Sequence, residues 1–386
     1  MHYFDHNATT PPAPEVVDVF ASALREWPAN ASSTHRAGQA ARQQLEVARF
    51  TVARSIGSSF PDEVVFTSGG TESNNLAILG LVRSLPSTRR HVITTSIEHP
   101  AVLEPFRRLE QEGAEVSFCS ANPDEVASMI RPETALVSVM HANNETGAVQ
   151  SVAEIGRAIR ERRDSGQPIY LHSDGVQALG KIDVNVDELG VDLYSVSAHK
   201  VYGPKGIGAL YVRKGTPLNG IQLGGRQERG RRAGTENVPA AVAFARALEL
   251  IPDFPLANIA VLRDRFEGRV VSSLEGVEIN GSITHRLPNT SNLLFRGLSA
   301  EVLLIALDTA GFAVSVGSAC SSGSIEPSHV LLAIGCTLAE ARSSVRFSFG
   351  RCNTPDEVDR LSETVIQIVG RLRRAKENRG RQLVAQ

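Results

Sequence analysis

Cysteine is scarce in this chain of 386 residues, and its four cysteines form no metal-binding pattern. They are Cys119, Cys320, Cys336 and Cys352, so no pair has the Cys-x-x-Cys spacing that is typical of zinc or iron–sulfur ligands. Four cysteines are also too few to staple a chain of this length with disulfides. The sequence therefore predicts neither a structural metal site nor a disulfide framework.

The chain also lacks a strong charge of either sign and any long apolar run. Its net charge of -2 gives no reason to expect direct contact with nucleic acid or with an anionic membrane. No apolar run approaches the length of a membrane span. The first residues, MHYFDHNATTPP, include an acidic side chain and no apolar core, which is unlike a secretory signal. These features predict a cytoplasmic protein.

Seven short apolar runs alternate with helix-like stretches through residues 60–215. The predicted strands are 63–66, 91–96, 115–119, 135–140, 169–174, 192–197 and 208–212. Such alternation predicts an α/β fold with a mostly parallel seven-stranded sheet. Ligands of such sheets gather at the carboxyl ends of the strands. Several of the predicted strands end in polar segments, so we expect the functional site at this edge.

The length of the chain favours two domains, because a single core stops growing below this size. The segment PDFPLA, at 252–257, holds two prolines and is typical of a junction. Beyond it we expect an α+β domain that ends in a helix starting near TPDE, where a threonine cap precedes a proline. The predicted division is a large domain at 13–255 and a small domain formed by 1–12 and 256–386.

Two glycine-containing segments suggest where a phosphorylated cofactor would bind. TSGGTES, at 67–73, follows a strand and opens a helix, where backbone N–H groups and hydroxyls suit a phosphate. An ordinary capped turn is the alternative for this segment. Lys200, in SAHKVYGPKGIG, stands between a strand and a glycine-rich turn. It is either a surface charge or, in a partly desolvated site, an amine able to form a Schiff base.

Four further polar residues lie at or near strand ends, and each has two interpretations. Asp174 is a turn residue or a carboxylate that faces a cationic ring nitrogen. His99 is a structural histidine or an imidazole that moves protons above a cofactor ring. Asn144 forms a turn or contacts ligands, and Arg346 is an exposed charge or a clamp for a substrate carboxylate. A phosphate site, a Schiff-base lysine and such a carboxylate are what pyridoxal phosphate requires.

Cys320 is the one cysteine whose surroundings indicate exposure and motion. It lies in SVGSACSSGS, a composition that is typical of flexible linkers. Cys119 and Cys336 accompany apolar runs and are expected to be packed thiols, whereas the role of Cys352 is undetermined. Cys320 is therefore either an idle thiol in a linker or a nucleophile that the loop allows to move. We expect residues 318–326 to be the mobile part of the enzyme.

Taken together, these segments resemble the cysteine desulfurases of the NifS/IscS type, which are class V aminotransferases with the fold-type I architecture. The resemblance covers nearly the whole chain. It rests on YFDHNATTPPAPEV, NASSTHRAGQAAR, TSGGTESNN, IEHPAV, HANNETG, HSDGVQ, SAHKVYGPKGIG, RAGTEN, GSACSSGSIEPSHVLLAIG and SVRFSFGR. RAGTEN and SACSSGS are similar to the motifs of the group with a long catalytic-cysteine loop.

The resemblance implies a role for each candidate residue. Lys200 would carry pyridoxal phosphate, Asp174 would pair with its ring nitrogen, and His99 would stack on the ring and move protons. Cys320 would be the nucleophile, and Asn144 and Arg346 would hold the substrate. The cofactor contacts implied in addition are Gly70, Thr71, Asn144, Gln177, Ser197, His199 and Thr235. Thr235 would reach the phosphate of a neighbouring subunit, which implies a homodimer with shared active sites.

The reaction implied by the resemblance converts L-cysteine to L-alanine and leaves a persulfide on Cys320 for an acceptor protein. The ending RGRQLVAQ lacks the extension by which housekeeping members dock an iron–sulfur scaffold, so the acceptor stays open between iron–sulfur assembly and other thiolation pathways. Alternatives are an aminotransferase, a selenocysteine lyase or a non-catalytic sulfur-transfer subunit. Transamination needs no mobile thiol, and the presence of Lys200, Asp174, His99 and Cys320 argues against a decayed site.

Overall fold

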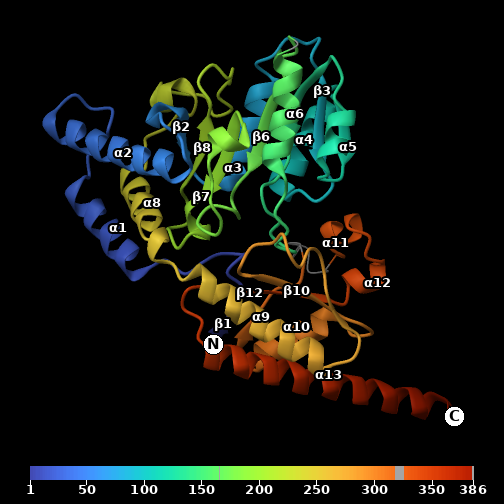
Figure 1. The fold of residues 1–386 in the computed structure, drawn as a ribbon. Coiled ribbons are helices and arrows are strands. Elements are labelled where there is room, and N and C mark those ends of the chain that lie inside the picture. The colour runs from blue at the N-terminus through green and yellow to red at the C-terminus, as the bar shows by residue number, and fades with distance from the viewer. Residues whose placement is uncertain (165, 318–325, 385–386) are drawn as a thin grey trace. The chain divides into compact units, whose positions relative to one another are not determined.

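The structure is a computed structural model that describes residues 1–164, 166–317 and 326–384 (Figure 1). The chain forms two compact units. The larger unit comprises Thr10–Asn143 and Val149–Asp253. The smaller unit comprises Met1–Thr9, Asn144–Ala148 and Phe254–Gln386.

A seven-stranded sheet forms the centre of the larger unit. Its strand order is β2-β8-β7-β6-β5-β3-β4. Only β8 runs against its neighbours, so six strands share one direction. The bounds are β2 Val64–Thr67, β3 His91–Thr95, β4 Glu115–Cys119, β5 Thr134–Ser138, β6 Tyr170–Asp174, β7 Leu193–Ser197 and β8 Gly208–Val212. The predicted α/β fold with a mostly parallel sheet is confirmed, as is each predicted strand.

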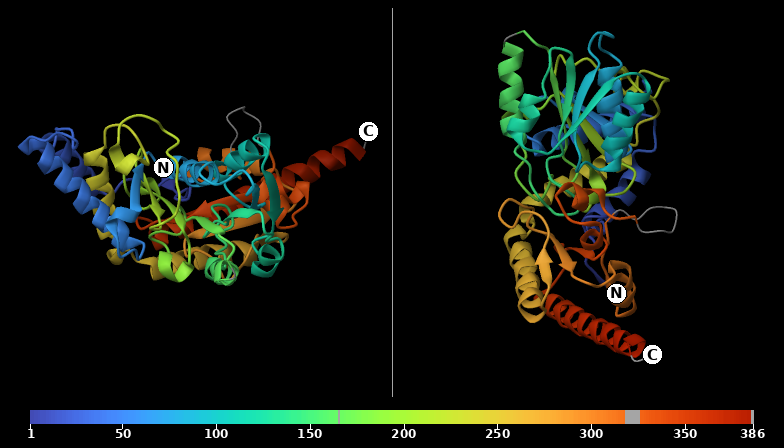
Figure 2. Two further views of the ribbon diagram at one scale, coloured as in Figure 1. Left: turned by 90° about the horizontal axis from the view of Figure 1, so that it is seen from above. Right: turned by 90° about the vertical axis from the view of Figure 1, so that its right-hand side faces the viewer.

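Helices cover both faces of this sheet, because successive side chains of each strand point to opposite faces. Val64 and Phe66 of β2 belong to a core cluster with residues of α2 (Arg36–Ser55), α6 (Val152–Asp164) and α8 (Val238–Glu249). Val65, between them, belongs to a second cluster with η2 (Leu76–Gly80) and α4 (Pro100–Gln111). The views in Figure 2 show α6 and α4 on opposite sides of the strands.

The remaining helical elements of the larger unit are short, apart from helix α1 near its first residues. Helix α1 packs against α8, next to α2. The bounds are α1 Pro14–Glu26, η1 Pro61–Glu63, α3 Gly70–Asn75, α5 Pro123–Ser128, α7 Val186–Leu189, η3 Ala198–Lys200, η4 Gln227–Gly230 and η5 Ile251–Asp253. Because β2, β3, β5, β6 and β7 point the same way, the segments that follow them meet at one edge of the sheet.

The smaller unit has its own sheet and its own core. Strands β9, β10 and β12 form an antiparallel sheet, and β1 pairs in parallel with β11. Phe266 and Phe347 pack with their ring centroids 4.6 Å apart in the core of this unit. The bounds are β1 His2–Tyr3, α9 Leu256–Ser273, β9 Val277–Ile279, β10 Thr290–Phe295, α10 Ala300–Thr309, β11 Phe312–Ala313, α11 His329–Ala333, α12 Leu338–Ala341, β12 Ser344–Ser348 and α13 Pro355–Val384.

Two further observations concern the whole of the described chain. No helix in the described ranges is long and apolar enough to cross a membrane. Among the same residues, no three His, Cys, Asp or Glu side chains come together in a way that could hold a metal ion.

Candidate active site

Lys200 lies on a tight turn directly after the central strand β7. The turn η3 carries Lys200, which is half-buried, and the chain folds back through hydrogen bonds from the N–H groups of Val201 and Gly203 to the carbonyl of Ala198. A Cβ atom at Gly203 would lie 2.8 Å from the Ala198 carbonyl oxygen, so only glycine fits there. Tyr202 has a φ of 62°, in the left-handed region. This compact turn fixes where the lysine leaves the sheet.

Asp174 ends the neighbouring strand β6, and its carboxylate is held on both oxygens. The side chain is 6% exposed. Its Oδ1 accepts a hydrogen bond from the N–H of Val176 at 2.9 Å, and its Oδ2 accepts one from Nδ2 of Asn74 at 2.7 Å. The next residue, Gly175, packs closely against the ring of Tyr194. A Cβ atom at position 175 would lie only 2.0 Å from Cζ of Tyr194, so a larger residue would clash. Asp174 is thus a fixed, buried carboxylate at the functional edge of the sheet.

Gln177 follows one turn later and is paired with a buried lysine. Nζ of Lys181 donates to Oε1 of Gln177 at 2.6 Å, and the Lys181 side chain is only 8% exposed. Because the carbonyl oxygen of the amide accepts from Lys181, the NH2 group of Gln177 is the end that is turned elsewhere. The contact thus fixes which end of the Gln177 amide faces Lys181.

His199 lies between these lysines and is neutral at physiological pH. Burial lowers the pKa of His199 to about 4, with further lowering by the positive charges of Lys200, Lys205 and Lys181. A neutral imidazole can donate from one nitrogen while the other accepts. The three ammonium groups make this edge of the sheet electropositive, which suits an anionic ligand.

The segment after β2 forms a cradle beside the end of β7. Gly69 has a φ of 152°, and a Cβ at that position would lie 3.7 Å from Oγ of Ser197. Gly70 begins α3, and Thr71 follows in its first turn. The Ser197 hydroxyl is buried and has no hydrogen-bond partner among the described residues. A buried hydroxyl normally has a partner, so this one indicates that a ligand oxygen pairs with it.

His99 is the N-cap of α4 and is oriented by that helix. Its Nδ1 accepts a hydrogen bond from the N–H of Ala101 at 3.0 Å, so in the neutral ring the proton is on Nε2. The preceding Glu98 is fully buried, and burial raises its pKa to about 8. Its Oε1 accepts hydrogen bonds from Thr95 and from the N–H of Met140, both at 2.7 Å. The strand end that carries His99 is therefore held by a buried carboxylic acid.

Thr235 lies on an exposed segment between η4 and α8. The neighbouring Gly234 donates its N–H to Oε1 of Gln227 at 3.2 Å. Farther back, Glu228 has a φ of 46°, and its carboxylate forms a buried ion pair with Arg49 at 2.6 Å. These contacts hold the segment, while Thr235 itself faces outward from the larger unit.

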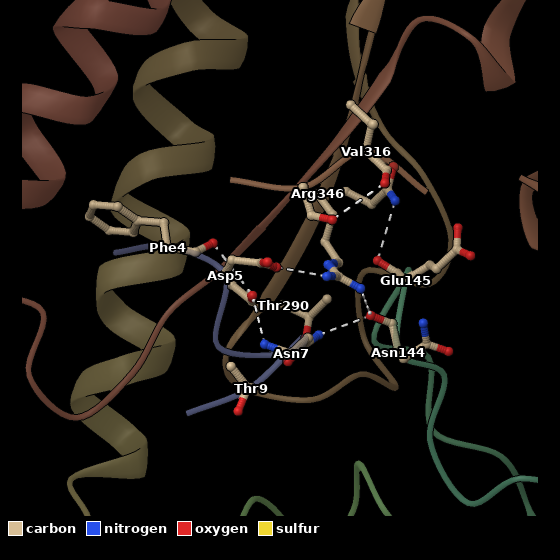
Figure 3. Close-up of polar contacts among 12 residues, drawn as sticks. Phe4, Asp5, Asn7, Thr9, Asn144, Glu145, Thr290, Val316 and Arg346 are labelled. Atoms are coloured by element: carbon tan, nitrogen blue, oxygen red, sulfur yellow. Dashed lines mark hydrogen bonds and ion pairs between the residues drawn. The ribbon is translucent and has the colours of Figure 1, made fainter. Parts of the chain in front are cut away.

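The two predicted substrate residues belong to the smaller unit (Figure 3). Arg346, on β12, donates from Nη1 to the carbonyl oxygen of Asn144 at 2.9 Å. Its Nη2 forms an ion pair with Oδ1 of Asp5 at 2.7 Å. Nε of Arg346 is buried and has no hydrogen-bond partner among the described residues. The guanidinium is thus held in place by two contacts, and its Nε–H has no partner among the described residues.

Residues 2–361 match the family model of the class-V aminotransferases. The chain belongs to the class-V aminotransferase family. It is 43% identical to the cysteine desulfurase IscS of Dictyoglomus turgidum, over 96% of this chain and 95% of the relative. It is 42% identical to the IscS of Methanosarcina thermophila, over 96% and 92%.

Solved structures agree with this assignment. A NifS-like protein superposes with a TM-score of 0.87 at 35% identity, over 96% of this chain and 99% of the other. The structure described as SspA in complex with cysteine gives 0.79 at 35% identity, over 92% and 100%. These members of the class-V family share the fold-type I architecture, so the expected fold family is confirmed.

Class-V aminotransferases of this kind depend on pyridoxal phosphate, and the larger unit fits that cofactor. It supplies an amine, a fixed carboxylate and a buried hydroxyl in need of a partner, which match the aldehyde, ring nitrogen and phosphate of the cofactor. The predicted residues that it brings to this edge are Gly70, Thr71, His99, Asp174, Gln177, Ser197, His199 and Lys200. Cys320 lies outside the described residues.

Three residues that contact the candidate site residues were not predicted from the sequence. Asn74 contacts Asp174, Lys181 contacts Gln177, and Asp5 contacts Arg346. For Lys181 a weak signal existed, since it follows Gln177 by four residues and so shares one side of a helical turn. Asn74 and Asp5 gave no usable signal, because their partners are 100 and 341 residues away.

Proposed function

We propose that this protein is a cysteine desulfurase, which removes sulfur from L-cysteine, releases L-alanine and retains the sulfur as a persulfide on Cys320. The single observation that carries the proposal is that the half-buried Lys200, the buried Asp174 and the unpaired hydroxyl of Ser197 come together at the same edge of the sheet, at the ends of adjacent strands. Chains with 43% identity over 96% of this one are named cysteine desulfurases.

Each candidate residue of the larger unit has a role in this proposal. Pyridoxal phosphate, when bound, supplies electron withdrawal from the α-carbon of an amino acid. Lys200 would attach the cofactor through Nζ, and the free amine would take the α-proton of the substrate. Asp174 pairs with the ring nitrogen, and Gln177 donates to the ring hydroxyl. The phosphate is bound by Gly70, Thr71, Ser197 and His199, with His199 acting as a neutral donor.

His99 is proposed to stack on the cofactor ring and to return protons from its Nε2. The hydrogen bond from Ala101 to Nδ1 supports this role, because it leaves the proton on the opposite nitrogen. An imidazole is suited to both proton uptake and proton release near neutral pH.

Arg346 and Asn144 are proposed to bind the substrate. The available Nε of Arg346 supports this role, because a carboxylate is bound best by two parallel N–H groups of one guanidinium. Asp5 holds Nη2 and would share it with the substrate carboxylate. Asn144 is also proposed as a polar contact to the cofactor, as in the sequence-based expectation.

Cys320 is proposed as the nucleophile. Its thiolate forms a bond with the substrate sulfur, and the bond from that sulfur to the β-carbon breaks. The electron pair of the broken bond stays with the carbon, which takes up a proton and becomes the methyl group of alanine. The terminal sulfur then passes to a thiol of an acceptor protein. The expected mobility of residues 318–326 concerns a segment of which all but the last residue lies outside the described ranges.

We further propose a cytoplasmic homodimer in which Thr235 contacts the cofactor phosphate of the other subunit. The outward position of Thr235 supports this arrangement. The proposed domains are 13–255 for cofactor binding and 1–12 with 256–386 for the catalytic cysteine. The acceptor is an iron–sulfur scaffold or a component of another thiolation pathway.

The test compares Cys320→Ala with Cys352→Ala, which changes an exposed cysteine of the smaller unit. We expect Cys320→Ala to keep the cofactor absorbance and to lose release of alanine and sulfide from L-cysteine in the presence of a reductant. Cys352→Ala should retain both, because no role is assigned to it. Full alanine release by Cys320→Ala would show that the nucleophile is wrong. If the wild-type protein transaminates L-cysteine and releases no sulfide, the desulfurase proposal is wrong and an aminotransferase takes its place.

A further inference from the structure

Asn74 lies against Asp174, although 100 residues separate them in the chain. It belongs to α3, the short helix that begins in the phosphate cradle and packs against β7 and β8. The side chain is 1% exposed, and its Nδ2 donates to Oδ2 of Asp174 at 2.7 Å. One helix therefore carries both the cradle and a donor to the carboxylate.

The orientation of the Asn74 amide is determined by this contact. If the amide were rotated by half a turn, its oxygen would face a carboxylate oxygen and would repel it. The observed orientation leaves Oδ1 of Asn74 buried and without a hydrogen-bond partner among the described residues. A buried unpaired oxygen of this kind costs about 1–3 kcal/mol. Folding stability alone therefore does not explain why an asparagine stands at position 74. The N–H group that it donates to Asp174 does explain it.

The second oxygen of Asp174 is held by the N–H of Val176 at 2.9 Å. Each carboxylate oxygen can accept two hydrogen bonds, so each keeps one acceptor position for a ligand. The two donors fix the plane of the carboxylate. A carboxylate held in this way presents its remaining acceptor positions in a constant direction to a ring nitrogen that carries a proton.

We propose that Asn74 is a positioning residue that keeps the carboxylate of Asp174 aimed at the ring nitrogen of pyridoxal phosphate. The inference rests on the proposed function, in which Asp174 pairs with that nitrogen. Without the Asn74 donor, the carboxylate loses one of the two hydrogen bonds that fix its plane, and its contact with the ring nitrogen weakens. Ring protonation is needed for electron withdrawal, so the loss of Asn74 weakens removal of the substrate α-proton.

The experiment uses Asn74→Ala in the full-length holoenzyme reconstituted with ¹⁵N-labelled pyridoxal phosphate. The ¹⁵N chemical shift of the resting enzyme reports ring protonation without any turnover. The second measurement is exchange of the α-hydrogen of L-alanine in D2O, which does not require Cys320. We expect the variant to shift the ¹⁵N signal toward the unprotonated ring and to slow exchange by about 10- to 100-fold.

The matched control is Asn122→Ala, which removes an exposed asparagine that caps α5. It should lower the melting temperature slightly and leave both measurements at the wild-type values. If Asn74→Ala folds and changes neither measurement, the inference is overturned. If Asn74→Ala does not fold, Asn74→Ser is measured instead, with the same two outcomes.

Asp174→Ala separates this inference from the proposed function. If Asp174→Ala changes both measurements and Asn74→Ala changes neither, only the role of Asn74 is wrong. If Asp174→Ala leaves ring protonation and exchange at wild-type values, the pairing of Asp174 with the ring nitrogen is wrong, and both proposals fall together.

Discussion

Burial keeps several histidines of the larger unit neutral, and His172 is the most extreme. His172 lies on β6, fully buried, where Nδ1 pairs with Oγ of Ser138 at 2.8 Å and Nε2 pairs with Oγ of Ser195 at 3.1 Å. Burial lowers the pKa of His172 to about 3, and it lowers that of His141 to about 4. Protonation of either ring would place a charge inside the sheet.

The low pKa of His172 predicts acid sensitivity. The unfolded chain binds a proton at this residue near the ordinary pKa of about 6.5, whereas the folded chain resists it until about pH 3. Its contribution to stability is therefore full above pH 6.5 and is lost as the pH falls from 6.5 to 3. We expect the free energy of unfolding to decline less steeply with falling pH in His172→Gln, by up to about 5 kcal/mol in total. Urea unfolding at a series of pH values measures this.

His285→Gln is the control for this measurement, because His285 lies exposed on a loop of the smaller unit. It should leave the slope of stability against pH as in the wild type. An unchanged slope for His172→Gln would show that other groups cause the acid sensitivity.

The sequence predicted those site residues whose positions follow from a strand end. Lys200 and Asp174 were found because each stands at the end of a predicted strand, in a polar segment. Asn74 and Asp5 were not found, because their function depends on partners that only the folded chain brings near. For Arg346 the sequence offered a carboxylate clamp, and it could not reveal that Asp5 already holds one nitrogen of the guanidinium.

At the scale of elements, a buried ion pair connects α2 with the turn η4. Arg49 donates to both carboxylate oxygens of Glu228, at 2.6 and 2.8 Å, and to the carbonyl of Val64 at 2.9 Å. Glu228 also accepts from the N–H of Phe66 at 2.9 Å. The backbone of Glu228 is left-handed, a conformation that is unfavourable for residues other than glycine. The ion pair is thus the contact that stabilises this turn against strand β2.

Removal of Arg49 should be strongly destabilising, because it leaves the Glu228 charge buried without a partner. We expect Arg49→Met to lower the free energy of unfolding by about 3–5 kcal/mol. Arg42→Met, on an exposed position of the same helix, should change it by less than about 0.5 kcal/mol. Chemical denaturation of both variants measures the difference. Equal effects of the two substitutions would mean that the buried ion pair contributes no more to the free energy of unfolding than the exposed Arg42 side chain does.

The elements themselves were predicted more fully than their arrangement. Each strand of the larger sheet is a short apolar run and could be read from the sequence. The strand order could not, because pairing between distant segments leaves no local pattern. The same holds for Asn144–Ala148, which belongs to the smaller unit although it lies between two segments of the larger one.

At the scale of the molecule, the two units have separate hydrophobic cores. One core of the larger unit contains Phe244 of α8 among residues of α2 and of the strands. The core of the smaller unit contains Phe347 of β12 with Phe266 of α9. Both Phe244 and Phe347 are fully buried. Each unit therefore has the internal packing that an independently unfolding body requires.

Because the cores are separate, we expect a substitution in one core to destabilise mainly the unit that contains it. Phe347→Ala should destabilise the smaller unit by about 3–5 kcal/mol, because it removes a buried ring and leaves a cavity. Calorimetry of the holoenzyme should then show an earlier transition for the smaller unit. The cofactor absorbance, which reports the larger unit, should be lost at the wild-type temperature. Phe244→Ala is the matched variant, and it should instead lower the temperature at which the absorbance is lost. If both variants shift the two signals by equal amounts, the units unfold as one cooperative body and the two cores are energetically coupled.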